Sequence, residues 1–160
     1  MRTMQQWFDE YGESHQNPIN KLMHWICIPL IFFSVYGLLA SIPSGFMQAL
    51  VPESVAPYAN FGTLLFIFGL IFYLRTSFSM FLGMLAVCVL TMMGNIYIDN
   101  NVGMSLWLVS LIIFVVAWIG QFYGHAVEGK KPSFFKDLQF LMIGPAWLLG
   151  FIYKKVGLSY

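Results

Sequence analysis

The sequence predicts an all-α, polytopic membrane protein. We expect one domain, residues 1–160, with about four transmembrane helices, an N-terminal amphipathic helix and a short apolar C-terminal segment. Of the 160 residues, 59% are hydrophobic and only 9% are charged, whereas a soluble domain carries about 25% charged residues. A soluble fold of this length could not cover so much apolar surface. The apolar residues also form separate runs, most of them near the roughly 20 residues that a helix needs to cross a bilayer.

Residues 1–17 predict an amphipathic helix at the membrane surface. Trp7, Phe8 and Tyr11 recur at helical spacing among polar residues, and an interfacial helix places such aromatic rings at the level of the headgroups. An ordinary cytosolic N-terminal helix is an equal alternative. A new helix then begins at about Pro18, because Asn17 is a preferred N-cap and proline is tolerated at the first helical position.

The membrane spans follow as apolar runs separated by turns. The predicted spans are residues 22–42, 60–75, 78–97 and 104–122. Pro29 should bend the first span, which a membrane helix tolerates. The last apolar segment, 138–153, is short for a full crossing. It predicts a re-entrant or interfacial hairpin, or alternatively a bent fifth span.

The distribution of lysine and arginine predicts the topology. Loops 43–59 and 98–103 contain neither residue, whereas the N-terminus, the 75–77 turn and segment 128–137 do. The positive-inside rule places the latter three on the cytoplasmic side. An even number of crossings separates the two histidines near the N-terminus from the third, so all three should lie on that side at one depth. They are His15, His24 and His125.

Two polar stripes accompany these histidines. The first contains Asn17, Asn20, Lys21 and His24, and the second contains Gln121, His125 and Glu128. Each follows the spacing of one helix face, and polar groups that face lipid are costly, so the stripes should face each other. His15 and His24 are nine residues apart, about 180° on a continuous helix. Both can face one site only if the helix breaks at Asn17-Pro18.

Three histidines at one depth predict either a metal site or structural hydrogen bonding. Neutral imidazole binds Zn, Fe, Cu and Ni, and three histidines plus a carboxylate would suit non-haem Fe(II). A closed structural zinc site would draw on cysteine, but Cys27 and Cys88 lie inside apolar runs. A net charge of +1 without a basic block indicates no nucleic-acid partner. No Walker loop, G-x-S-x-G or H-E-x-x-H motif is present.

These polar motifs resemble those of the Mpo1-like family. They are Tyr11-x-x-x-His15-x-Asn17-x-x-Asn20-Lys21-x-x-His24, then Ile28-Pro29, and Gln121-Phe122-x-Gly124-His125-x-x-Glu128-Gly129-Lys130-x-Pro132. The resemblance implies an Fe(II)-dependent membrane dioxygenase that uses O2 to shorten 2-hydroxy fatty acids by one carbon, releasing CO2. The compact loops resemble a bacterial member, which would lie in the inner membrane. A eukaryotic member would lie in the endoplasmic reticulum. In either case the site would face the cytoplasm.

The resemblance also implies roles for individual residues. His15, His24 and His125 would be the iron ligands, and Glu128 would be a fourth ligand or the partner of a ligating histidine. Lys21 or Lys130 would pair with the substrate carboxylate. The ligands or the substrate would be oriented by Asn17, Asn20 and Gln121. Two other functions suit the same residues: a non-enzymatic membrane carrier or assembly protein with structural histidines, and a Zn-dependent lipid hydrolase.

Overall fold

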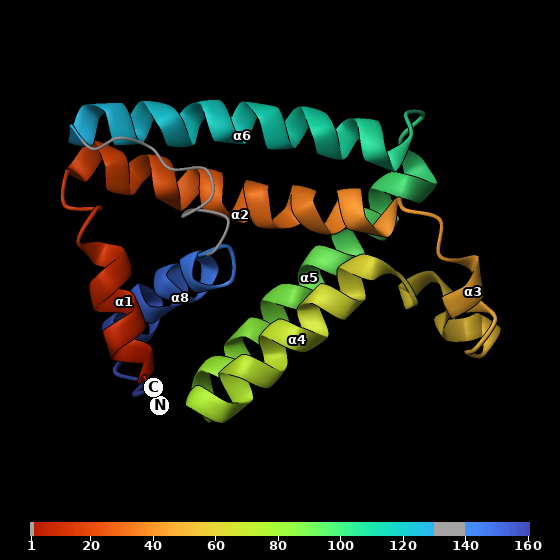
Figure 1. The fold of residues 1–160 in the computed structure, drawn as a ribbon, viewed down its shortest axis with the longest axis horizontal. Coiled ribbons are helices and arrows are strands. Elements are labelled where there is room, and N and C mark those ends of the chain that lie inside the picture. Colours follow the sequence, from red (N-terminus) through yellow and green to blue (C-terminus); the bar gives the residue numbers. More distant parts are fainter. Residues whose placement is uncertain (1, 130–139) are drawn as a thin grey trace.

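The protein is all-helical, as predicted, throughout the residues that the computed structural model describes, 2–129 and 140–160 (Figure 1). Its elements are α1 (Met4–Gly12), α2 (Pro18–Ala40), α3 (Gly45–Gln48), the 3₁₀ helix η1 (Glu53–Tyr58), α4 (Phe61–Thr76), α5 (Phe78–Asn101), α6 (Leu106–Glu128) and α8 (Ile143–Val156). Helices α2, α5 and α6 are long and apolar enough to cross a membrane, and α4 is a shorter apolar helix.

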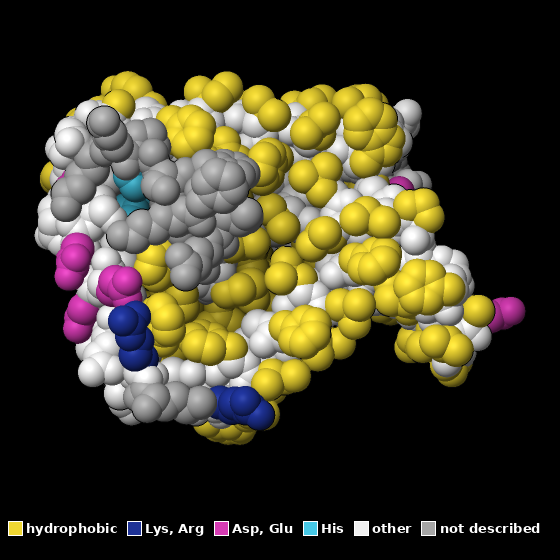
Figure 2. Space-filling model, in the orientation of Figure 1, with side chains coloured by type: hydrophobic (Ala, Val, Ile, Leu, Met, Phe, Trp, Pro, Cys, Tyr) yellow, Lys and Arg dark blue, Asp and Glu magenta, His cyan; other side chains and the backbone are white. Residues whose placement is uncertain are grey.

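The helices fall into three groups (Figure 1). Helices α2 and α6 lie side by side, α4 and α5 form a hairpin inclined to them, and α1 and α8 pack together near the N-terminal end of α2. Both termini lie beside α1 and α8. Most of the face in Figure 2 is hydrophobic, and the lysine, arginine and acidic side chains visible there gather mainly toward the end that carries the termini.

Helix α6 is longer than the predicted span 104–122. The helix continues through Gly124 and ends at Gly129, which has a φ of 73°, in the left-handed conformation that glycine adopts without strain. His125 and Glu128 therefore lie on the last turns of a rigid helix. Helix α5 likewise continues to Asn101, so the first residues of the expected 98–103 turn are helical.

Helix α8 covers the described part of the apolar C-terminal segment, whose residues 138 and 139 lie outside the described ranges. It has 14 residues, fewer than the roughly 20 that a crossing needs. Its first half is buried against α1, α2 and α5. Length and burial therefore favour the re-entrant or interfacial alternative over a fifth span.

Glycine residues allow α2 and α6 to approach closely. A Cβ atom added to Gly120 would lie 2.6 Å from Sγ of Cys27, and one added to Gly124 would lie 2.5 Å from Oδ1 of Asn20. Both distances are shorter than a van der Waals contact. Small residues four apart are the usual means by which apolar helices pack tightly. The pair Gly120 and Gly124 thus sets the spacing of the two helices that carry His24 and His125.

Replacing Gly124 with alanine should loosen this packing. The new methyl group would displace Asn20, and such overpacking costs about 1–3 kcal/mol. We expect Gly124→Ala to lower the thermal unfolding midpoint of the protein in detergent. Gly103→Ala is the control, because a Cβ there has no neighbour within 4 Å. Equal midpoints for the two variants would contradict this account of the α2–α6 interface.

Candidate metal centre

Three different parts of the chain supply the histidines. His15 lies in the connection between α1 and α2, His24 in the second turn of α2, and His125 near the end of α6. The predicted helix break is present: α1 ends at Gly12, and Asn17 caps α2 by accepting a hydrogen bond from the Ile19 N–H at 2.8 Å. The break turns His15 back toward His24, as the sequence predicts.

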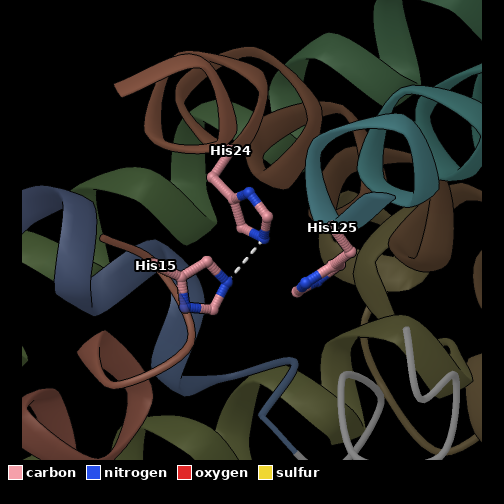
Figure 3. Close-up of side chains that lie close together, drawn as sticks. All are labelled: His15, His24 and His125. Carbon is pink, nitrogen blue, oxygen red and sulfur yellow. Dashed lines mark hydrogen bonds between the residues drawn. The ribbon is translucent and has the colours of Figure 1, made fainter. Parts of the chain in front are cut away.

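The three imidazole rings converge on one point (Figure 3). One ring nitrogen from each of His15, His24 and His125 lies within 4.8 Å of the other two. Their exposed fractions are 1%, 0% and 3%. Among the described residues, this is the group of histidine, cysteine and acidic side chains whose spacing could hold a metal ion. The structure thus brings together the residues that the resemblance implied as ligands.

Hydrogen bonds to backbone carbonyls determine which ring nitrogens carry protons. Nδ1 of His15 donates to the Tyr11 carbonyl at 2.6 Å, and Nδ1 of His24 donates to the Asn20 carbonyl at 2.8 Å. Because a carbonyl can only accept, each neutral ring presents an unprotonated Nε2. Metal-bound histidines typically show this same Nδ1–H to carbonyl contact. Both rings are therefore held in the tautomer that a metal ligand needs.

The two Nε2 atoms lie 2.7 Å apart (Figure 3). Two lone pairs at this distance repel each other, so the arrangement requires a shared cation, either a proton or a metal ion. Burial lowers the pKa of His15 to about 4, even though its hydrogen bond to the Tyr11 carbonyl acts in the opposite direction. Protonation is therefore disfavoured at neutral pH. The unprotonated Nε2 atoms are therefore available to a metal ion, which binds neutral imidazole.

Glu128 contacts the loop that carries His15. Its carboxylate accepts hydrogen bonds from the backbone N–H groups of Gln16 at 2.9 Å and Asn17 at 2.8 Å, and from the Asn20 side chain at 3.1 Å. Both carboxylate oxygens are engaged, and Glu128 is not part of the close group of ligand atoms. These contacts tie the end of α6 to the α1–α2 connection, so they give Glu128 a positioning role.

The other predicted residues surround the cluster in different ways. Asn20 is fully buried, and its side chain also donates to the Ser14 carbonyl at 3.1 Å. Gln121 is buried one turn before His125, and its Oε1 accepts no hydrogen bond from residues 2–129 or 140–160. It lines a small cavity of about 20 Å³, enough for about one water molecule. Lys130 lies outside the described residues.

A larger cavity of about 290 Å³ leads to His15. We call it the His15 cavity. The start of α2 and the preceding loop form one wall with His15 and Lys21, and α8 forms another with Trp147, Phe151 and Lys154. Asp9 and Glu13 also line it, so both signs of charge are present. Of the predicted site residues, Lys21 is therefore the cation placed at this cavity.

Two aromatic residues that contact His15 were not predicted as site residues, although Tyr11 belongs to the motif that resembles the family. Tyr11 stacks on its ring, with centroids 4.3 Å apart and an angle of 22° between the planes. The ring centroid of Trp147 lies 5.6 Å from that of His15 and 5.3 Å from that of Tyr11. Tyr11 stands one helical turn before His15, a spacing that could have identified it. Trp147 comes from α8, and no periodicity in the sequence connects it to the histidines.

Fold and site together define an all-helical protein that carries long membrane-type helices and a buried three-histidine cluster suited to a metal ion. Comparison with known proteins gives the family. The model of the family described as 2-hydroxy-palmitic acid dioxygenase Mpo1-like matches residues 1–156, and the chain belongs to this Mpo1-like family. The resemblance predicted from the motifs is thereby confirmed.

A curated relative shows the extent of the similarity. The chain is 31% identical over 149 residues to a protein of Saccharomyces cerevisiae named 2-hydroxy-palmitic acid dioxygenase MPO1. The match covers 92% of this chain and 78% of the relative. No solved structure matches the chain.

Removing the charge of Glu128 should weaken metal binding without removing a ligand. Glu128→Gln cannot accept all three hydrogen bonds, so the loop that holds His15 should become less ordered. Loss of such an outer contact typically lowers metal affinity about 10–100-fold. The measurement is a metal titration of the purified protein. Glu53→Gln, in η1, is the control, and unchanged affinity in Glu128→Gln would contradict the positioning role.

Proposed function

We propose that the protein is an Fe(II)-dependent membrane dioxygenase that converts 2-hydroxy fatty acids into fatty acids one carbon shorter. The observation that carries the proposal is the buried pair of Nε2 atoms of His15 and His24, 2.7 Å apart with His125 beside them. The name of the yeast relative, 2-hydroxy-palmitic acid dioxygenase, supports the substrate class and the type of reaction.

The donor set suits iron. His15, His24 and His125 would hold the ion through neutral nitrogen, and three protein ligands leave positions for a chelating hydroxy acid and for O2. Bound Fe(II) would supply the one-electron chemistry that allows O2 to react with a closed-shell acid. The carbonyls of Tyr11 and Asn20 keep the Nδ1 protons in place, so both Nε2 atoms stay available at neutral pH.

Other residues would bind and orient the acid. Lys21 lines the His15 cavity and would attract the substrate carboxylate. Gln121 would donate or accept a hydrogen bond beside His125, where its buried oxygen has no partner among the described residues. The stacked ring of Tyr11 and the indole of Trp147 would fix the plane of His15 and exclude water.

The overall reaction balances without an external reductant. One 2-hydroxy fatty acid and one O2 give the acid one carbon shorter, one CO2 and one water. The C1–C2 bond breaks, and the carbon that carries the hydroxyl group becomes the new carboxyl carbon. The acid supplies all the electrons that reduce O2, so no organic redox cofactor is required.

A membrane location follows from the same proposal. Helices α2, α5 and α6 would lie in the bilayer with the histidine cluster toward its cytoplasmic side, where the positive-inside rule places the lysines and arginines. The acyl chain of the substrate could then stay in an apolar environment. For a bacterial member this would be the inner membrane, and for a eukaryotic one the endoplasmic reticulum.

Metal analysis tests the proposed centre. We expect near-stoichiometric iron in protein purified without oxygen, and little iron after dialysis of His15→Ala, His24→Ala or His125→Ala. Asn100→Ala, at an exposed position of α5, is the control and should retain iron. Zinc in place of iron would support the lipid hydrolase, which could use the same three imidazoles. Absence of any metal would favour the non-enzymatic alternative.

Product analysis tests the reaction. Iron-loaded protein should convert 2-hydroxyhexadecanoic acid and O2 into pentadecanoic acid and CO2 in equal amounts. Hexadecanoic acid, which lacks the hydroxyl group, should remain unchanged because its C2 carries no oxygen to become a carboxyl. Persistence of the 2-hydroxy acid in the presence of bound iron would refute the substrate assignment and leave the metal centre standing.

A further inference from the structure

Helix α8 separates the His15 cavity from a second hollow. Trp147, Phe151 and Lys154 face the His15 cavity. The neighbouring face of the same helix lines a groove of about 360 Å³. Its α8 residues are Pro145, Leu148, Leu149 and Ile152, at the spacing of one helical stripe.

The groove is apolar along almost its whole length. Helix α2 contributes Trp25, Pro29 and Phe33, and α5 contributes Leu90 together with Thr91, the one polar side chain in the lining. Helices α2, α5 and α8 pack against one another, and their side chains form the walls of the groove. The groove thus has the chemistry of a site for a hydrocarbon chain.

The groove begins next to the metal centre. Trp25 directly follows His24, and its ring lies 6.1 Å from that of Phe151, which lines the His15 cavity. Pro145 lines both the groove and the small cavity that contains Gln121. The Trp25–Phe151 ring contact therefore lies between the polar and the apolar hollows.

We propose that this groove binds the acyl chain of a single-chain carboxylic acid whose head group lies in the His15 cavity. The inference rests on the proposed function and names the chain-binding part of its site. The head cavity is lined by Lys21 and Lys154 as well as by Asp9 and Glu13, and it lies beside an apolar groove. This arrangement suits an amphiphile with a charged head group, whose carboxylate would pair with the lysines. A volume of about 360 Å³ is near the lower end of ligand pockets, about 300–1,000 Å³. It suits one chain rather than the two of a phospholipid.

Photocrosslinking locates the chain directly. The probe is hexadecanoic acid with a diazirine in the middle of its chain, added to the purified full-length protein in detergent. Mass spectrometry should place the crosslinks on groove residues such as Phe33, Leu90 and Leu148. Unlabelled 2-hydroxyhexadecanoic acid should abolish them, and a diacyl phospholipid should not.

A matched pair of variants tests the same site by affinity. Leu90→Trp fills the groove, whereas Val89→Trp makes the same change at the next residue of α5, outside the groove lining. Both positions are exposed, at 68% and 44%, so both variants should fold. In wild type and Val89→Trp, affinity for saturated acids should rise about fourfold per methylene from dodecanoic to hexadecanoic acid. In Leu90→Trp, affinity should stop rising at a chain length shorter than in the other two proteins.

Several results would overturn the groove proposal. Crosslinks spread over the outward faces of α4 and α6 would show that the chain only follows lipid-exposed surface. Displacement of the probe by phospholipid would assign the groove to a bilayer lipid. If affinity depends on chain length in the same way in Leu90→Trp and Val89→Trp, the groove does not bind the acyl chain. None of these measurements requires turnover, so the two proposals can fail separately. Binding in the groove without conversion of the 2-hydroxy acid would refute only the proposed reaction. Conversion without crosslinks in the groove would refute only the proposal that the groove binds the acyl chain.

Discussion

The close packing of α2 against α6 is the constraint on which the candidate site depends. Gly120 and Gly124 let the two helices approach until Asn20 and Cys27 touch the backbone of α6. At this spacing His24 and His125 reach the same point, with ring centroids 5.0 Å apart. A side chain larger than glycine at either position would separate the helices, and the ligand atoms would move apart with them. The shape of the site is therefore set by residues that bear no ligand atom.

Positioning of His15 requires a second, polar constraint. His15 belongs to no helix, so the packing of Tyr11 and Trp147 on its ring is complemented by polar contacts to its loop. Glu128 supplies this constraint, because its carboxylate accepts hydrogen bonds from two backbone N–H groups of the loop and from the side chain of Asn20. Asn20 in turn offers its carbonyl to His24. The three histidines are thus linked through one charged group and one amide, and hydrogen bonds to a charge are stronger than neutral ones.

The sequence was sufficient to predict that the histidines share one side of the molecule, because helix count and the Asn17-Pro18 break determine that outcome. It was not sufficient for the role of Glu128. Its spacing after His125 puts the carboxylate on the ligand stripe, but only the folded loop shows that backbone N–H groups occupy both oxygens. The contact of Trp147 with His15 could not be predicted either, because α8 reaches the site through tertiary packing and no spacing in the sequence indicates that contact. The helical spacing of Gln121, His125 and Glu128 predicted that the helix continues beyond the apolar span 104–122, and the structure shows that Gly129 ends it.

Position in the fold connects the cluster to its proposed chemistry. The three imidazoles lie at the end of the α2–α6 pair, deep enough to be fully buried yet next to a cavity that contains Lys21 and Lys154. Burial lowers the pKa of His15, so its ring stays neutral and its Nε2 would be available to a metal ion. A site in the middle of the spans would offer a carboxylate no polar route from the aqueous side. On an exposed loop, water would surround the imidazoles and they would be protonated more readily. At a helix end, the proposed 2-hydroxy acid could present its head group to a metal ion held by the histidines while its chain stays among apolar side chains.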